Sequence, residues 1–124
     1  MARFAPQPHH CAAPPHFVNG GIIGTLIDCH CICTAIAAAY FDAGRAIGSA
    51  PELFLVTADL RLQFRRPTPI AGPLNLYADI AARLDNGYRV SCKLEVQKKV
   101  CVEAEVTAVQ VSQAWMDAQL STTK

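Results

Sequence analysis

A long apolar segment dominates the first half of the chain. From Gly20 to Phe41, 22 residues include only one acidic side chain, Asp28, and one histidine, His30, and no Lys, Arg or Glu. Asn19 is a good helix N-cap and the alanines further on are strong helix formers, so we predict a helix from Ile22 to about Phe41. Its apolar positions do not keep to one stripe, which predicts a helix buried nearly all round and wrapped by a sheet.

The second half of the chain alternates apolar and polar residues, which is typical of strands with one buried face. Asp85-Asn86-Gly87 predicts a hairpin turn, because Asn-Gly accepts positive φ, and Lys98-Lys99 marks another turn. One helix followed by an antiparallel meander predicts an α+β fold with the helix at its centre. The four predicted strands are Leu53–Arg65, Leu74–Leu84, Arg89–Gln97 and Val100–Ala108.

The chain length of 124 residues predicts one domain. Four prolines between residues 6 and 15 predict an irregular segment over residues 1–18. We expect the folded domain to occupy residues 19–112, with a loop over residues 42–51. Residues 113–124 form the tail, in which Ala114 to Leu120 are expected to be a short helix or a frayed end.

Composition narrows the classes of partner. The chain is 52% hydrophobic and 17% charged, an apolar excess that predicts a subunit interface. Its net charge of +1 indicates no nucleic-acid partner. The segment from Gly20 to Phe41 is long enough to span a membrane, but the central Asp28, the two opening glycines and the soluble-type alternation that follows predict no membrane association.

Six cysteines are present and no secretory leader is recognisable, so we expect reduced, mostly buried thiols in a cytoplasmic protein. Cys29 and Cys33 lie four residues apart on one helix face. Neither they nor the His9-His10-Cys11 run match the spacing of a zinc site, so no metal and no cofactor are expected.

The start of the helix carries the candidate chemistry. The first backbone N–H groups of a helix have no internal partner, so Gly20 and Gly21 can bind an oxyanion. Asp28 follows about two turns later, and a carboxylate partly removed from water becomes a stronger base. This combination indicates carbonyl chemistry. The alternatives are that the glycines only allow tight packing and that backbone or Thr hydroxyl groups cap Asp28.

The sequence resembles a known family. Asn19-Gly20-Gly21, five apolar or small residues and then Ile27-Asp28 are similar to the helix start of hotdog-fold acyl-CoA thioesterases, particularly the phenylacetyl-CoA type. Thr57-Ala58-Asp59-Leu60, Phe64-Arg65-Arg66-Pro67 and Gly72-Pro73-Leu74 resemble the family's second strand and following turn. The resemblance covers residues 19–111 and implies a hotdog fold.

The resemblance implies roles for individual residues. The Gly20 N–H would polarise the thioester carbonyl, Asp28 would be general base or nucleophile, and Thr57 would hold the attacking water. Strict alternation puts Thr57 on the opposite strand face from Leu60, so it reaches Asp28 only if that face turns toward the site locally, as a bulge would allow. The family often has Asn or Gln before the glycine pair, where this chain has Ala12-Ala13-Pro14-Pro15.

That departure leaves His16 or Asn19 as the further donor to the carbonyl, with Asn19 equally suited to be only the helix cap. The resemblance also implies an acyl-CoA substrate, for whose phosphates Arg65 and Arg66 are the foremost candidates among the basic residues. It implies a homodimer with a continuous sheet, or a homotetramer. Gly20 of one subunit would face Asp28 and Thr57 of the other.

Two other functions use the same fold. A non-catalytic acyl-CoA sensor would bind the thioester without needing a base. A hydratase or dehydratase would pair a His, such as His16, with an acid. An interaction domain with a vestigial site is a further alternative.

Overall fold

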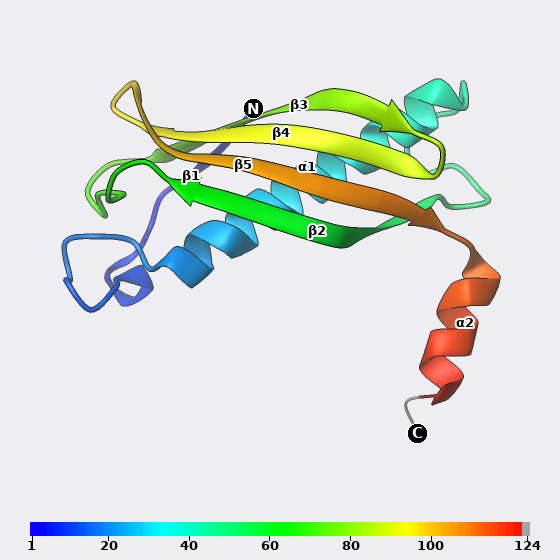
Figure 1. Cartoon of the computed structure of the whole chain (residues 1–124), viewed down its shortest axis with the longest axis horizontal. Helices are drawn as coiled ribbons and strands as arrows, with labels where there is room; N and C mark the ends of the chain where they lie inside the picture. Colours follow the sequence, from blue (N-terminus) through cyan, green and yellow to red (C-terminus); the bar gives the residue numbers. More distant parts are fainter. Residues whose placement is uncertain (123–124) are drawn as a thin grey trace.

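The computed structural model describes residues 1–122 and has the predicted α+β architecture. A single long helix packs against one antiparallel sheet of five strands, in the order β1-β3-β4-β5-β2 (Figure 1). The helices and strands are β1 (Ala2–Phe4), η1 (Pro8–His10), α1 (Gly20–Asp42), β2 (Phe54–Phe64), β3 (Leu74–Leu84), β4 (Gly87–Val96), β5 (Lys99–Val111) and α2 (Gln113–Thr122).

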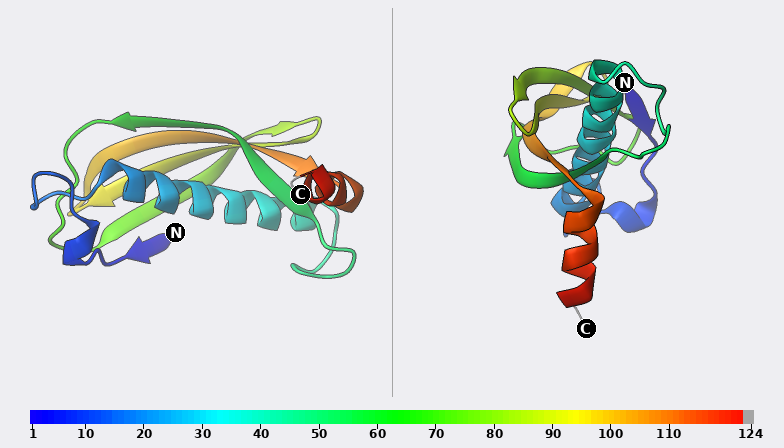
Figure 2. Two further views of the ribbon diagram at one scale, coloured as in Figure 1. Left: turned by 90° about the horizontal axis from the view of Figure 1, so that it is seen from below. Right: turned by 90° about the vertical axis from the view of Figure 1, so that its right-hand side faces the viewer.

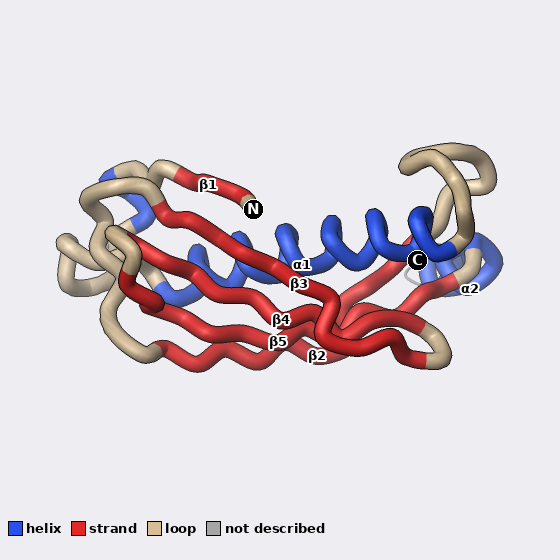
Figure 3. The backbone as a smooth tube through the Cα atoms, turned by 90° about the horizontal axis from the view of Figure 1, so that it is seen from above, coloured by secondary structure: helices blue, strands red, loops and turns tan. Residues whose placement is uncertain are grey.

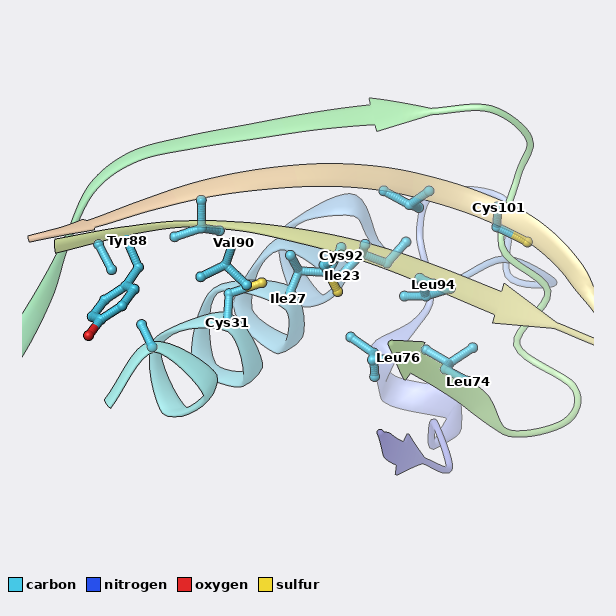
Figure 4. Packing of buried hydrophobic residues seen from close by; sticks show 14 of the residues in the cluster. Ile23, Ile27, Cys31, Leu74, Leu76, Tyr88, Val90, Cys92, Leu94 and Cys101 are labelled. Carbon is cyan, nitrogen blue, oxygen red and sulfur yellow. The ribbon is translucent and has the colours of Figure 1, made fainter. Parts of the chain in front are cut away.

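The sheet curves around one side of α1 (Figure 2). The side chains that α1 buries recur every four residues, at Ile23, Ile27, Cys31, Ala35 and Ala39. They interdigitate with apolar side chains from the central strands (Figure 4). This stripe follows from helical geometry, because residues four apart lie on one helix face.

The prediction that α1 is buried nearly all round is wrong for a single chain. Thr25, Cys29 and Cys33 on the opposite face are exposed, and Phe41 is 78% exposed. Figure 3 shows the sheet on one side of α1 only. The sheet is too narrow to close around the helix. The face of α1 opposite the buried stripe therefore has no cover from this chain.

A bulge interrupts β2. Thr57 pairs with Ala108 and Asp59 pairs with Thr107, which leaves Ala58 without a partner on β5. An extra residue in one strand reverses the alternation of faces beyond it. Thr57 therefore shares the helix-facing side of the sheet with Leu62 and Phe64, so the condition under which the sequence allowed Thr57 to reach Asp28 is met.

Two tight hairpins join the central strands. Asp85 and Asn86 connect β3 to β4 where a turn was predicted, but neither they nor Gly87 adopts positive φ. Gly87 is required for another reason: a Cβ there would collide with the Ala108 carbonyl of β5. The second turn falls one residue earlier than predicted, at Gln97 (φ 51°) and Lys98 (φ 64°).

Both ends of the chain add structure. Residues 1–18, expected to be irregular, contain β1, which pairs with β3 along Leu74 to Leu76, and the short helix η1. The tail forms α2, which projects away from the sheet (Figure 1). The prolines exclude long elements from the first segment, but they leave room for three residues of strand.

Candidate active site

Asn19 forms the cap at the start of α1. Its side-chain oxygen accepts a hydrogen bond from the Gly21 N–H at 2.7 Å, and its carbonyl accepts from the Ile23 N–H at 3.1 Å. The cap therefore occupies the Gly21 N–H, which was predicted to bind the substrate oxyanion. A Cβ on Gly21 would lie 3.1 Å from the Asn19 Oδ1 atom, so glycine also gives the cap its space.

Gly20 retains a free donor. Its N–H has no acceptor among residues 1–122, and the residue is exposed at the positive end of the helix dipole. A Cβ on Gly20 would lie 3.6 Å from the Phe64 ring, an ordinary contact. A larger residue at position 20 would therefore fit sterically within the single chain.

Asp28 and Thr57 are brought together by the bulge in β2. The Thr57 hydroxyl donates to Asp28 Oδ1 at 2.6 Å. Asp28 is half-buried on α1, and its Oδ2 atom accepts no hydrogen bond within the described part of the chain. The Thr57 proton is committed to Asp28, so the hydroxyl lone pairs can accept from a further donor. A water molecule can therefore donate to two acceptors, Asp28 Oδ2 and the Thr57 oxygen, while the bond from Thr57 holds Asp28 Oδ1 in place.

Gly20 and Asp28 of one chain lie far apart. They are eight residues apart on a continuous helix, which is about 12 Å along its axis. One carbonyl group cannot contact both. The chain therefore contains two half-sites, a donor at the helix start and an acid–hydroxyl pair two turns on.

The histidines lie outside this pair. His16 is exposed in the loop before α1, where its carbonyl accepts from the Ile70 N–H at 2.9 Å, and its ring contacts neither Asp28 nor Thr57. His30 is half-buried with no partner for Nε2 among the described residues. Burial, with a smaller contribution from the positive N-terminus, lowers the pKa of His30. It is thus a neutral side chain near neutral pH.

The two arginines after β2 differ in their surroundings. The Arg65 guanidinium bonds Glu103 Oε2 at 2.7 and 2.9 Å and also Gln63, on the sheet face away from α1. Arg66 has no carboxylate partner within residues 1–122. Both arginines were predicted phosphate ligands from their place after the predicted strand, and the partnership of Arg65 with Glu103 was not foreseen, because the pairing of β2 with β5 decides that contact.

All six cysteines are free thiols. Cys31, Cys92 and Cys101 are buried, Cys11 is half-buried, and Cys29 and Cys33 are exposed. No group of three or more metal-ligating side chains gathers within residues 1–122. The exposed pair lies on the uncovered face of α1.

A long helix cradled by an antiparallel sheet, with a free N–H at the helix start and a carboxylate two turns on, defines a hotdog-type protein. Comparison with solved structures agrees. A thioesterase superfamily protein from Shewanella loihica PV-4 is 33% identical, covers 90% of this chain and 82% of its own, and has a TM-score of 0.68. This chain belongs to the thioesterase superfamily, in its hotdog-type family, as the sequence predicted.

More distant structures share the fold. A putative thioesterase related to phenylacetic acid degradation from Ralstonia eutropha JMP134 is 24% identical, with TM-score 0.63 over 86% of this chain and 72% of that chain. A Bacillus halodurans protein solved with CoA is 18% identical, with TM-score 0.70 over 88% of this chain and 65% of that chain. No protein-family profile and no curated protein sequence matches the chain.

Proposed function

We propose that this protein hydrolyses acyl-CoA thioesters in a reducing, cytoplasmic setting. The observation that carries the proposal is the hydrogen bond from Thr57 to Asp28, which leaves the second carboxylate oxygen open on a chain of the thioesterase superfamily. The CoA found with the Bacillus halodurans protein of the same fold supports the choice of thiol. The hydratase alternative needs His16 beside Asp28, whereas within residues 1–122 of one chain the donor to the Asp28 carboxylate is Thr57.

The acid–hydroxyl pair suits activation of water. A water molecule that donates to Asp28 Oδ2 and to the Thr57 oxygen is held with a lone pair free to attack. Its oxygen bonds to the thioester carbon and Asp28 takes its proton; the C–S bond then breaks to release the thiolate, which takes that proton from Asp28 and leaves as the thiol. Direct attack by Asp28, giving an anhydride that water opens, uses the same open oxygen.

The Gly20 N–H completes the site by stabilising the carbonyl oxygen as it becomes negative. Hydrogen-bond donors of this kind act in the transition state, where the charge develops. Because Gly20 and Asp28 of one chain are about 12 Å apart along the helix, the two must come from different copies. A homodimer, alone or paired into a tetramer, supplies both, and the uncovered apolar face of α1 supports assembly.

Asp28→Asn tests the base. The amide keeps the shape and can still accept from Thr57 but cannot take a proton, so thiol release should fall roughly 10²- to 10⁴-fold. Thiol release from a panel of short, long and aromatic acyl-CoAs would also identify the acyl class. Wild-type turnover in a folded Asp28→Asn variant would contradict the proposal.

Gly20→Pro tests the donor, because Gly20 is the first helical residue, a position at which proline is tolerated. Asn19, at φ −60° and ψ 134°, already has the conformation favoured before proline. The substitution replaces the N–H by a ring carbon and keeps the helical start, so the donor is lost and turnover should fall about 10²- to 10³-fold. Gly20→Ala is the matched control: it keeps the N–H and should retain most activity.

Mixing the two inactive variants tests the shared site. If Gly20 and Asp28 act across subunits, a mixed dimer of Gly20→Pro and Asp28→Asn chains has one intact site. Random reassortment should then restore about a quarter of wild-type activity. A mixture no more active than its components would show that each chain works alone.

A further inference from the structure

The positive charges of this protein fall into two groups. Four arginines on or beside the strands are paired with carboxylates: Arg61 with Asp59, Arg65 with Glu103, Arg83 with Asp42 and Arg89 with Glu105. Within residues 1–122 six cations have no such partner, and two of them, Arg66 and Lys99, line the same hollow; the other four are Arg3, Arg45, Lys93 and Lys98. Unpaired cations that lie close together repel each other, so their grouping favours an anion between them.

Arg66 and Lys99 meet at one end of the sheet. The Arg65 and Arg66 N–H groups both donate to the Cys101 carbonyl, at 2.8 and 3.2 Å, which anchors the end of β2 two residues from Lys99. Lys99 pairs directly with Val96, so their side chains share a face. Val96 is buried, and that face is therefore the side of the sheet that carries α1.

A hollow of about 360 Å³ lies between these residues. Arg66, Lys99 and the Gln97 amide supply its polar lining, and Phe17 is among its apolar walls. None of its lining residues is acidic. The remaining walls are Pro67, Pro69, Val96 and Cys101. A flat apolar wall beside two cations suits a ligand that carries both an aromatic ring and phosphate groups.

The hollow adjoins the start of α1. Phe17 pairs with Pro69, and the Val18 N–H donates to the Thr68 carbonyl at 2.9 Å, two residues before Gly20. On the other side, the Phe64 ring lies 3.6 Å from the position that a Cβ on Gly20 would take, and Phe64 is two residues before Arg66. The end of β2, the turn between β4 and β5 and the start of α1 lie at the same end of the molecule (Figures 1 and 2).

We propose that this hollow binds the phosphorylated adenosine end of the CoA thioester, with Arg66 and Lys99 as its phosphate ligands and Phe17 beside the base. This inference rests on the proposed function, because it fixes the substrate as a CoA thioester and not a carrier-protein thioester. Arg65, held by Glu103 on the other face, takes no part. The pantetheine arm then runs from the hollow toward the Gly20 N–H.

The test compares two substrates with one acyl group, an acyl-CoA and the matching acyl-pantetheine, which lacks the nucleotide. Arg66→Gln and Lys99→Gln should each raise the KM for acyl-CoA about tenfold, the loss expected for one charge-assisted hydrogen bond. The KM for acyl-pantetheine and both kcat values should stay unchanged. Lys93→Gln, which removes one exposed charge from the outer sheet face, is the matched control.

The outcomes separate this inference from the proposed function. Equal effects on both substrates, or none, would overturn the hollow as the nucleotide site while thioester hydrolysis stands. A wild-type preference for carrier-protein thioesters, with slower hydrolysis of them by Arg66→Gln, would overturn the nucleotide site in favour of a protein partner. If wild type hydrolyses no thioester, calorimetry with adenosine 3′,5′-bisphosphate decides: binding lost in Arg66→Gln supports the hollow, and no binding to wild type overturns it.

Discussion

Gly87→Ala is expected to be among the most damaging single-methyl additions to the sheet. Gly87 opens β4 and pairs with Val109 of β5. A Cβ there would lie 2.9 Å from both the Ala108 carbonyl carbon and the Val109 Cα atom, and closer still to the Ala108 oxygen. These are backbone atoms of a strand paired on both sides, so no side-chain rotation can relieve the overlap.

The cost can be worked from this geometry. Carbon atoms rest at about 3.5–4.0 Å, so β4 and β5 must separate locally by roughly 1 Å. The strain of the inserted methyl group costs about 1–3 kcal/mol. The separation also weakens neighbouring hydrogen bonds, such as that from the Gln110 N–H to the Asn86 carbonyl at 2.7 Å, at about 1 kcal/mol each. We expect a total loss near 3 kcal/mol, or roughly 10 °C in Tm.

Urea unfolding followed by far-UV circular dichroism, at one fixed protein concentration, measures the loss. Gly24→Ala is the control. Its Cβ would lie 3.3 Å from Leu62 Cδ1, the end of a flexible side chain, and helix propensity offsets the crowding by about 1 kcal/mol. A Gly87→Ala midpoint within about 0.5 kcal/mol of wild type, with an unchanged m-value, would refute the steric argument.

Two further predictions concern pairs of polar or turn residues. The Tyr88 hydroxyl donates to Asp42 at 2.7 Å, and burial, together with this bond, raises the pKa of Tyr88 to about 12. The protonated Tyr88 hydroxyl contributes fully to stability below the unfolded pKa of about 10, and this contribution is lost as pH rises from there to 12. The free energy of unfolding of wild type should therefore fall more than that of Tyr88→Phe over this range. Parallel curves of unfolding free energy against pH would contradict this. Replacing Gln97-Lys98 by Asn-Gly should add about 1 kcal/mol to the free energy of unfolding, since both residues have positive φ, and an unchanged or lower urea midpoint would contradict that.

The periodicity of the sequence was sufficient to predict the main elements. The switch from a continuous apolar run to alternation separates α1 from the strands, and β3 begins and ends at the predicted residues. Periodicity does not show how far the sheet extends around the helix. The sheet covers one face of α1, and whether the second face is covered depends on width and curvature, which no local pattern encodes.

In the candidate site, too, some features follow from the local sequence and others depend on how the strands pair. Asn19 as cap and the approach of Thr57 to Asp28 were both predictable, the second only on the condition of a bulge. The position of that bulge, at Ala58, has no local signature, because it depends on register with β5. Gly87 was recognised as special for the wrong reason: a turn preference was expected, and close backbone approach is found.

The chain order of the fold has a consequence for synthesis. α1 leaves the ribosome before any of β2 to β5, and it is the one helix within residues 1–122 long and apolar enough to cross a membrane. Roughly 70 further residues must be translated before β5 is complete, which takes about 3–14 s at 5–20 residues per second. Until then the apolar helix has no complete sheet to bury it. The yield of folded protein therefore depends on how well the nascent helix is shielded until its sheet emerges.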